Sequence, residues 1–298
     1  MNNPRVTVIV VCYNHLQYVE ESIYSVLNQT YKNVELIVAD DHSLDGSVEL
    51  LTKLSKRLGF LFFANERNTG LNNTILKALE SSTGSFISIL ASDDYIKPDK
   101  TEKQVKYLLE TGKEGVYANG FSVINEKKEL IKLNPVFTQK DNNKILHYIY
   151  QYDWGAPLLQ SGLFSKKMVT NLLPLRKEYK SDDWVFLIKA FEQHNTGYMD
   201  EPLFYYRLHP TNTHKKYWFT FPMRMDIAAR LVPDAYRTKT ISNILLSQGQ
   251  YLLADKKIFS GLKFFMSSLF LHFSFNNMIF MAKSIAVFFR NMVYKTSS

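Results

Sequence analysis

The chain has 298 residues, a length that accommodates one large domain or a domain with an appended segment. Its hydrophobic content of 46% and charged content of 21% are typical of globular proteins and exclude an intrinsically disordered chain. The single cysteine, Cys12, excludes an internal disulfide and agrees with a reducing compartment. The N-terminal residues lack the apolar core and cleavage site of a signal peptide, so we expect a cytoplasmic protein.

The net charge of +8 is concentrated near the C-terminus. Residues 256–298 contain six Lys or Arg, no Asp or Glu, and nine of the 21 phenylalanines. Positive charge among aromatic residues suits an anionic membrane surface better than a nucleic-acid groove. We therefore expect no nucleic-acid partner, and peripheral contact of residues 256–298 with the inner face of the cell membrane. Packing of this segment on the rest of the protein is the alternative.

The apolar runs of this C-terminal segment are too short for a membrane span. His272, Asn276, Asn277 and Lys283 interrupt them. The pattern predicts two amphipathic helices with a turn near Asn276–Asn277.

Strand and helix signals alternate through the first 115 residues. Apolar, β-branched runs predict strands over 6–11, 33–39, 60–64 and 85–91. Helical periodicity follows each of the first three strands, with Asn14 and Asp45 as expected N-terminal caps of the first two helices. This alternation predicts right-handed βαβ units and an α/β fold, in which helices sandwich a mostly parallel sheet.

From about Gly115 the pattern becomes less regular. The sequence predicts a strand over 115–124, a short helix over 141–152, a loop, strand and helix start over 154–169, a capped helix over 181–194, and a strand that runs into a polar loop over 201–214. After Trp218 the pattern is helical. We therefore expect a domain over 1–217, with halves 1–115 and 116–217, and a helical extension over 218–298.

A polar cluster follows each of the first four predicted strands. The clusters are CYNH (12–15), DDHSLDGS (40–47), NERNTG (65–70) and SDDY (92–95). Ligands of open parallel sheets bind outside the carboxyl ends of the strands, where these four clusters would meet. The sequence therefore predicts one site at this edge.

The motifs that the sequence contains and lacks limit the kinds of ligand and reaction that this site could serve. The chain has neither a G-x-G-x-x-G nor a G-x-x-x-x-G-K-[ST] phosphate loop, and it lacks the G-x-S-x-G of α/β-hydrolases. Three acidic pairs remain: Asp40/Asp41, Asp93/Asp94 and Asp182/Asp183. Divalent cations such as Mg²⁺ bind to one or two carboxylates together with substrate phosphates. An acidic site of this kind can bind a diphosphate through the charge of a metal ion.

In their order along the chain, these motifs resemble the inverting family 2 glycosyltransferases of the GT-A fold. The resemblance covers residues 5 to about 215 and is carried by the segment 6–47, by NTG at 68–70 and by SDDY followed by IKP at 92–98. It implies a catalytic domain over 1–217, with a nucleotide-sugar-binding half over 1–115 and an acceptor-side half over 116–217. The family often has Gly where this chain has His42, and Pro or Thr where it has Val11 and Cys12.

The resemblance also implies roles for individual residues on the donor side. Tyr13 would stack on the donor base, Asp41 would hydrogen-bond the base, and Asp40 would assist near the ribose. Asp94 would ligate Mn²⁺ or Mg²⁺ bridging the diphosphate, and Asp93 would hold the ribose or a metal-bound water. Turn formation is the alternative role for Asp40 and Asp41.

On the acceptor side, the resemblance implies that the catalytic base lies in the SDDW segment 181–184. Asp183 is the favoured base, Asp182 is the next candidate, and helix capping is the alternative role for both. In YRLHP (206–210), His209 would contact the metal or the phosphate, and an ordinary loop histidine is the alternative. LLQSGLFS (158–165) resembles the acceptor-side loop, with Gly162 at its tight point.

These roles imply a reaction between a nucleotide-sugar donor and a saccharide acceptor. The base removes a proton from the acceptor hydroxyl, which attacks the anomeric carbon from the face opposite the nucleotide and inverts its configuration. Uracil is the family's commonest base, and Asp41 would equally serve thymine. We expect a lipid-linked acceptor in bacterial surface-polysaccharide biosynthesis. A non-catalytic nucleotide-sugar-binding or scaffold protein that retains the fold is the alternative.

Overall fold

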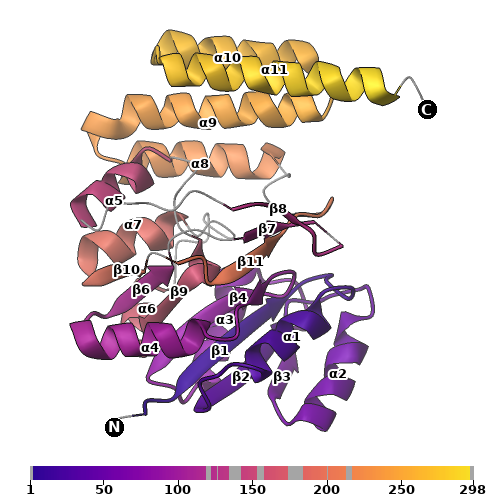
Figure 1. Cartoon of the computed structure of the whole chain (residues 1–298), viewed down its shortest axis with the longest axis vertical. Coiled ribbons are helices and arrows are strands. Elements are labelled where there is room, and N and C mark those ends of the chain that lie inside the picture. Colours follow the sequence, from indigo (N-terminus) through magenta and orange to yellow (C-terminus); the bar gives the residue numbers. More distant parts are fainter. Residues whose placement is uncertain are drawn as a thin grey trace. The chain divides into compact units, whose positions relative to one another are not determined.

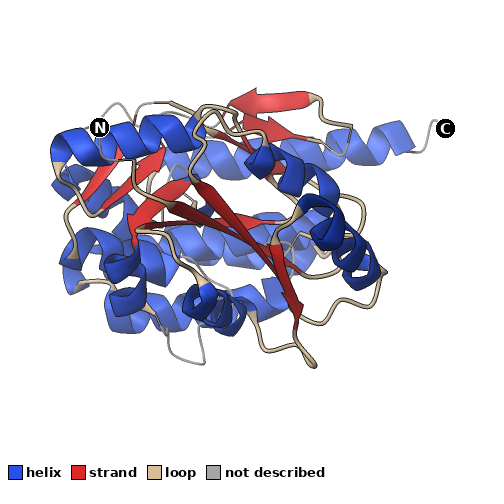
Figure 2. Ribbon diagram, turned by 90° about the horizontal axis from the view of Figure 1, so that it is seen from below, coloured by secondary structure: helices blue, strands red, loops and turns tan. Residues whose placement is uncertain are grey.

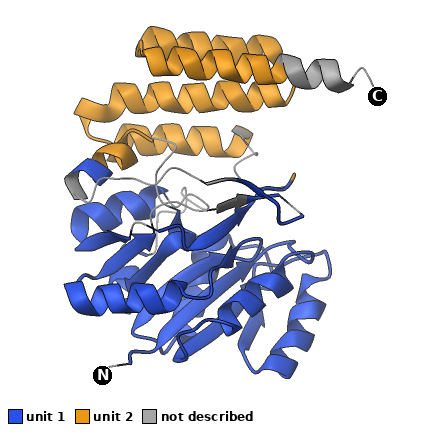
Figure 3. Cartoon of the chain, viewed as in Figure 1, with its two compact units in different colours: residues 1–145, 157–209 blue, residues 146–156, 210–298 orange. Residues whose placement is uncertain are grey.

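The computed structural model describes residues 3–118, 122–125, 127–133, 142–152, 158–173, 184–199, 201–212 and 217–295. The chain divides into two compact units (Figure 3). Unit 1 comprises residues 1–145 and 157–209, and unit 2 comprises residues 146–156 and 210–298. The functional division that we expect between residues 217 and 218 stays a prediction.

Unit 1 alternates strands and helices along the chain (Figure 1). Its first half contains β1 (Val6–Cys12), α1 (Val19–Leu27), β2 (Val34–Asp40), α2 (Ser47–Leu58), β3 (Leu61–Ala64), α3 (Leu71–Ser81), β4 (Phe86–Ala91), β5 (Tyr95–Ile96) and α4 (Lys100–Thr111). Its second half contains β6 (Gly115–Ala118), β7 (Ser122–Ile124), β8 (Leu130–Leu133), the start of α5 (Asn142–Tyr150), a short 3₁₀ turn (Leu159–Ser161), β9 (Gly162–Ser165), α6 (Lys166–Leu172), α7 (Trp184–Gln193), β10 (Thr196–Met199) and β11 (Phe204–Arg207). The rest of α5, from residue 146, belongs to unit 2.

The main sheet of unit 1 has the strand order β10-β6-β9-β4-β1-β2-β3. β1 pairs in parallel with both β2 and β4, β3 extends the parallel set beyond β2, and only β9 pairs antiparallel with its neighbours. Helices cover both faces of the sheet (Figure 2). The expected α/β architecture, a mostly parallel sheet sandwiched by helices with a helical C-terminal region, is confirmed.

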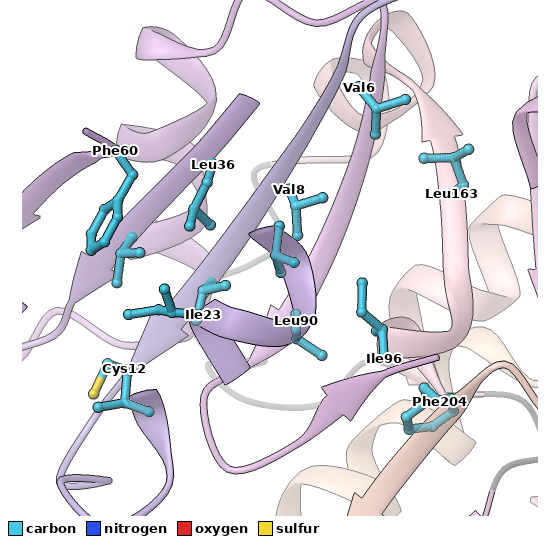
Figure 4. Close-up of a cluster of buried hydrophobic side chains, with 14 of the residues drawn as sticks. Val6, Val8, Cys12, Ile23, Leu36, Phe60, Leu90, Ile96, Leu163 and Phe204 are labelled. Atoms are coloured by element: carbon cyan, nitrogen blue, oxygen red, sulfur yellow. The ribbon is translucent and has the colours of Figure 1, made fainter. Parts of the chain in front are cut away.

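The core of unit 1 explains why the first strand is apolar throughout. All seven residues of β1 are buried, because both faces of the strand are covered. On one face Val6, Val8, Val10 and Cys12 pack against α1, α2 and α4 (Figure 4 shows part of this cluster). Ile9, on the other face, is equally buried.

The loops after β1 and β2 are tied to each other by side-chain hydrogen bonds. Asn14 does not cap α1, which begins at Val19, and its Oδ1 instead accepts from the backbone N–H of Leu44 at 2.8 Å. Asp45 lies two residues before the first residue of α2, where its Oδ1 accepts from the N–H of Ser47 at 3.0 Å. Its Oδ2 accepts from the N–H of Leu16 at 2.9 Å. The predicted caps therefore serve partly as cross-links between two loops at the carboxyl edge.

A second sheet of unit 1 has the order β5-β11-β7-β8. The single strand predicted over 115–124 is thus divided between the two sheets, with β6 in the main sheet and β7 in the second. β11 lies between β5 and β7, and its residues Phe204 and Tyr205 pair with Ile96 and Tyr95. This pairing brings the segment before His209 next to the residues that follow β4.

Unit 2 contains α8 (Tyr217–Leu231), α9 (Asp234–Ala254), α10 (Ile258–Leu271) and α11 (Phe275–Lys295). α10 and α11 both pack on α9 around Leu246, Leu253 and Phe265 (Figure 1). α9 and α10 come especially close at two glycines, because a Cβ on Gly249 would lie only 2.5 Å from the ring of Phe265. No helix among the residues that the structure describes is both long enough and apolar enough to cross a membrane.

The turn between the last two helices lies earlier than the sequence predicts. It comprises residues 272–274, and Asn277 lies inside α11. The side chain of Asn277 is buried and donates to Ser242 Oγ at 3.3 Å, which explains how a polar residue is tolerated within the helix.

The cation of Lys100 is fully buried in unit 1. Lys100, the first residue of α4, donates from Nζ to Ser88 Oγ at 3.0 Å and to the carbonyl of Gly162 at 3.1 Å. Burial lowers the pKa of Lys100 from 10.5 to about 7. The unfolded chain therefore keeps this proton up to about pH 10.5, whereas the folded chain releases it near pH 7. The resulting penalty, on the order of 5 kcal/mol, is fully present below pH 7 and disappears as the pH rises toward 10.5.

We expect Lys100→Met to raise the free energy of unfolding at pH 7, because it removes the buried charge and keeps the length of the side chain. The Gly162 carbonyl would retain the hydrogen bond that Ser88 Oγ donates to it at 3.0 Å. Urea unfolding followed by circular dichroism should show this gain shrinking by about 2 kcal/mol between pH 7 and pH 9. Lys53→Met, at an exposed position of α2, is the matched control. An equal difference between Lys100→Met and wild type at both pH values would contradict a depressed lysine pKa.

Candidate functional site

The polar clusters that follow the first strands meet at one edge of the main sheet. In the parallel register Cys12 pairs with Asp40, Asp40 with Ala64, and Val11 with Ala91. The residues after these positions are Tyr13, Asp41, Asn65 and Ser92, so they lie along the carboxyl edge where α/β sheets bind ligands. The structure thus brings together the four segments from which the sequence predicts a site.

Asp41 holds the start of helix α3. Its Oδ1 accepts from the N–H of Thr69 at 2.8 Å and from Asn65 Nδ2 at 3.0 Å, and its Oδ2 accepts from the N–H of Gly70 at 2.8 Å. Burial opposes the ionisation of Asp41, but these hydrogen bonds outweigh it and hold its pKa below the usual value. Asp41 is therefore an ionised carboxylate that fixes the loop between β3 and α3.

Asp40 closes the turn after β2. Its Oδ1 accepts from the N–H of Ser43 at 2.7 Å and its Oδ2 from Ser43 Oγ at 2.6 Å, and the side chain is buried. His42, between them, has a φ of 68°, a left-handed conformation that glycine adopts at less cost. This backbone conformation explains why glycine is usual at the position in the family that the sequence resembles.

Tyr13 and Cys12 differ sharply in exposure at the end of β1. The side chain of Tyr13 is 43% exposed, so its ring is accessible to a ligand at this edge. Cys12 is fully buried, and burial raises the pKa of its thiol to about 12. Cys12 is therefore a core residue and not a nucleophile.

Asp93 lies beside two imidazoles that come from distant segments. His209 Nε2 is 2.9 Å from Asp93 Oδ2, and His15 Nδ1 is 3.8 Å from Asp93 Oδ1. One potential ligand atom from each of the three residues lies within 4.8 Å of the others. They form the only such cluster of metal-ligating side chains among the residues that the structure describes.

The carboxyl group of Asp94 bonds to the backbone of β11, whereas that of Asp93 lies beside the imidazoles. Asp94 Oδ1 accepts from the N–H of Arg207 at 2.9 Å, and its buried Oδ2 has no hydrogen-bond partner among the described residues. Burial, together with the neighbouring charge of Asp93, raises the pKa of Asp94 well above its usual value. The pKa of Asp93 is lowered despite burial, because His209 hydrogen-bonds its carboxylate and both imidazoles favour its charge. Asp93 is therefore the more readily ionised of the two.

Arg207 holds the Asp93–Asp94 turn from behind. Its guanidinium is almost fully buried, where Nε donates to the carbonyl of Asp93 at 2.9 Å and Nη2 donates to Glu21 Oε2 at 2.6 Å. The same group lies 5.0 Å from the ring centroid of Tyr18, whose ring is in turn 4.9 Å from that of His209. Arg207 therefore links α1 and β11 to the turn and fixes the position of both carboxyl groups.

A surface depression adjoins this network. Its volume is about 560 Å³, and Tyr18, Glu21, Lys128 and Arg207 are among the residues that line it. Glu21 pairs there with both cations, through Oε2 with Arg207 and through Oε1 with Lys128 Nζ at 2.8 Å. Glu20 also lines the depression, so two carboxylates balance two cations and the lining carries no net charge.

Of the residues predicted on the acceptor side, the structure describes Gly162 but not Asp182 or Asp183. Asp182 and Asp183 lie outside the described residues, immediately before α7, which begins at Trp184. Gly162 is described, and its carbonyl accepts the hydrogen bonds from Ser88 and Lys100. A Cβ at Gly162 would lie 2.0 Å from the ring of Phe164, so no larger residue fits without displacing that ring.

The sequence motifs alone indicate no role for His15, Arg207 or Glu21. His15 lies two residues after Tyr13 in the loop that follows β1, and this position was the only signal that separated it from the other histidines. Its Nδ1 is also 2.9 Å from Ser92 Oγ, the first residue of the SDDY segment.

The donor set of the His15–Asp93–His209 cluster fits a divalent metal ion. Imidazole nitrogen and carboxylate oxygen together suit Mn²⁺ and the other first-row divalent ions, whereas Mg²⁺ prefers oxygen ligands alone. The second imidazole therefore favours Mn²⁺ over Mg²⁺.

Sequence comparison identifies related proteins. A family model described as Glycosyl transferase family 2 matches residues 7–166, which is just over half of the chain. An uncharacterized glycosyltransferase of Haemophilus influenzae is 27% identical over 252 residues, covering 73% of this chain and 99% of the relative. A Bacillus subtilis protein named as a teichuronic acid biosynthesis glycosyltransferase, TuaG, is 37% identical over 110 residues, covering 36% of this chain and 43% of the relative.

Solved structures with a similar fold include two glycosyltransferases with bound ligands. S. aureus TarS (residues 1–349) in complex with UDP gives a TM-score of 0.57 at 17% identity, covering 85% of this chain and 83% of the TarS chain. The mannosyltransferase PcManGT from Pyrobaculum calidifontis, in complex with GDP-Man and Mn²⁺, gives a TM-score of 0.59 at 14% identity, covering 96% of this chain and 81% of that chain. At these identities the likeness shows the shared GT-A fold.

We expect His15→Ala to weaken Mn²⁺ binding by about tenfold or more, because it removes one of the three candidate ligands. Isothermal titration with Mn²⁺ measures the affinity directly and needs no turnover. Asp93→Asn and His209→Ala should have effects of the same order, and His272→Ala, in unit 2, should have none. Unchanged affinity in His15→Ala with a large loss in His209→Ala would show that His15 supports the site through Ser92 and is not a ligand.

Proposed function

Because the chain belongs to glycosyl transferase family 2, we propose that it transfers a sugar from a nucleotide-diphospho-sugar to an acceptor hydroxyl, with inversion of the anomeric carbon. The observation that carries this proposal is the His15–Asp93–His209 cluster at the carboxyl edge of the sheet. The edge is acidic, so it needs a cation to receive a diphosphate. The cluster supplies ligands for that cation at the place where α/β sheets bind nucleotides.

We propose that the donor base stacks on the exposed ring of Tyr13. Asp41 would accept the base N–H through a lone pair of Oδ2, which among the described residues accepts the N–H of Gly70. Asp40, held by Ser43, would act near the ribose mainly by keeping this turn in place. TarS has been crystallised with UDP and with UDP-GlcNAc, which supports a UDP-linked donor for this chain.

Asp93 and His209, together with His15, would hold the divalent cation. When bound, the ion would neutralise the charge of the departing nucleoside diphosphate. Asp94 would support this arrangement through its bond to the N–H of Arg207, and its unpartnered Oδ2 makes it the next candidate ligand. The Mn²⁺ complex of PcManGT, which has the same fold, supports metal dependence.

We propose Asp183 as the base that removes the proton of the acceptor hydroxyl, with Asp182 as the second candidate. Both precede Trp184, the first described residue of α7, in the sequence. The sequence predicts a helix start at residue 181, and the dipole of a helix N-terminus would favour the ionised carboxylate that a base requires. The leaving group is a nucleoside diphosphate, so a single carboxylate suffices. This arrangement differs from glycosidases, which divide acid and base roles between two carboxyl groups.

The acceptor that we propose is a lipid-linked saccharide in surface-polysaccharide biosynthesis. The relative named for teichuronic acid biosynthesis supports this substrate class. The basic, phenylalanine-rich segment 256–298 supports it too, since a protein that contacts the cytoplasmic membrane face would meet such an acceptor there.

Release of nucleoside diphosphate from a panel of nucleotide sugars, with and without Mn²⁺, tests the reaction. We expect metal-dependent release from one donor and a loss of about 100-fold or more in kcat for Asp183→Asn, because general base catalysis contributes on that scale. Asp93→Asn should also lose activity, and added Mn²⁺ should partly restore it. Asp255→Asn, at an exposed position after α9, is the control. Binding of a nucleotide sugar without turnover of any donor or acceptor would instead support a scaffold protein.

A further inference from the structure

Helix α10 carries large apolar side chains on a face that no described part of unit 2 covers. Phe259, Met266 and Phe270 are 90%, 61% and 95% exposed. Their spacing of seven and four residues places them in one stripe along the helix. Exposure of this degree is unusual for large apolar side chains, and three of them on one helix face define a candidate interaction surface.

The opposite face of α10 packs against α9. Phe265 is fully buried between α10 and α9, with Ile258 and Leu262 packed beside it. Gly261 and Ser268 allow α9 to approach closely, and the Oγ atoms of Ser268 and Ser242 lie 2.9 Å apart. The exposed stripe is therefore additional to what the helix needs for packing in unit 2.

The exposed apolar surface continues through the turn into α11. Phe273 and Phe275 are 70% and 66% exposed, and Met278 and Ile279 follow at 36% and 39%. α10 and α11 lie side by side on α9 (Figure 1), so the two helices form one layer. We call the exposed residues of this layer the α10–α11 face.

The charge of the α10–α11 face indicates what covers it. Lys263 is exposed within the stripe, between Phe259 and Met266 in the sequence. Lys256, just before α10, and Lys283, in α11, are exposed too. No Asp or Glu occurs anywhere from residue 256 to residue 298. Lysine beside exposed phenylalanine, without carboxylates, is complementary to anionic lipid headgroups above an apolar layer. A protein partner would not require a segment free of negative charge.

We infer that the α10–α11 face docks on the surface of an anionic lipid bilayer. Phe259, Met266 and Phe270 enter the interface, and Lys263 pairs with the headgroups. Because no described helix is suited to cross a membrane, α10 lies along the surface. This inference goes beyond the proposed reaction, and vesicle binding can be measured without turnover. Loss of vesicle binding is therefore distinguishable from loss of sugar transfer.

The test is flotation of the full-length protein with two kinds of vesicle, pure phosphatidylcholine and phosphatidylcholine with 30% phosphatidylglycerol. We expect binding to the anionic vesicles at least tenfold stronger than to the neutral ones, and weaker binding at high salt. Phe259→Ser with Phe270→Ser should reduce binding about tenfold or more, and Lys263→Glu should reduce it in the anionic vesicles.

The matched control is Leu44→Ser, because Leu44 is 81% exposed and lies in unit 1. The substituted positions are exposed, and circular dichroism verifies that each variant is folded. Equal flotation of wild type and the double phenylalanine variant would overturn the inference. Absence of flotation together with a dimer in light scattering, lost in the double variant, would also overturn it and assign the face to a second copy of the chain.

Discussion

The site depends on how two adjacent carboxyl groups are accommodated at the end of a buried strand. Asp93 and Asp94 follow β4 after a single residue, Ser92, and two full charges there would repel each other. The protein separates their roles, since His15 and His209 favour the ionised form of Asp93 while burial favours the protonated form of Asp94. Arg207 makes this possible by hydrogen-bonding the backbone of one residue and the side chain of the other. The second sheet brings Arg207 to this position, so both sheets contribute to the site.

The sequence predicts most of the main sheet, because β1, β2 and β4 are buried on both faces and therefore read as continuous apolar runs. It also predicts the edge at which the polar clusters meet. It does not predict which carboxylate of a pair faces the imidazoles, since Asp93 and Asp94 are neighbours of the same residue type. That distinction depends on a backbone N–H of β11, more than a hundred residues further along the chain.

Asn14 and Asn277 illustrate a second limit of sequence reasoning. A polar residue before a helix suggests a cap, yet Asn14 instead bonds the loop after β2. A polar residue within an apolar segment suggests a turn, yet Asn277 is paired with Ser242 inside the helical unit. In each case the partner is about 30 or more residues away in sequence. Local patterns identify such residues as unusual, and only the tertiary contacts show which interaction each one makes.

The distribution of charge explains why the overall net charge is a poor guide to the ligand. A chain with a charge of +8 suggests a polyanion such as nucleic acid, but the edge of the main sheet is acidic and would repel a phosphate. The positive charge belongs to another unit, where a few lysines lie among exposed phenylalanines. In a protein that binds nucleic acid, the bases stack on aromatic rings that lie along a track of basic residues. The stripe of α10 instead has one lysine among three apolar side chains. This ratio of apolar surface to charge favours a lipid interface, and it leaves the acidic edge to act through a cation.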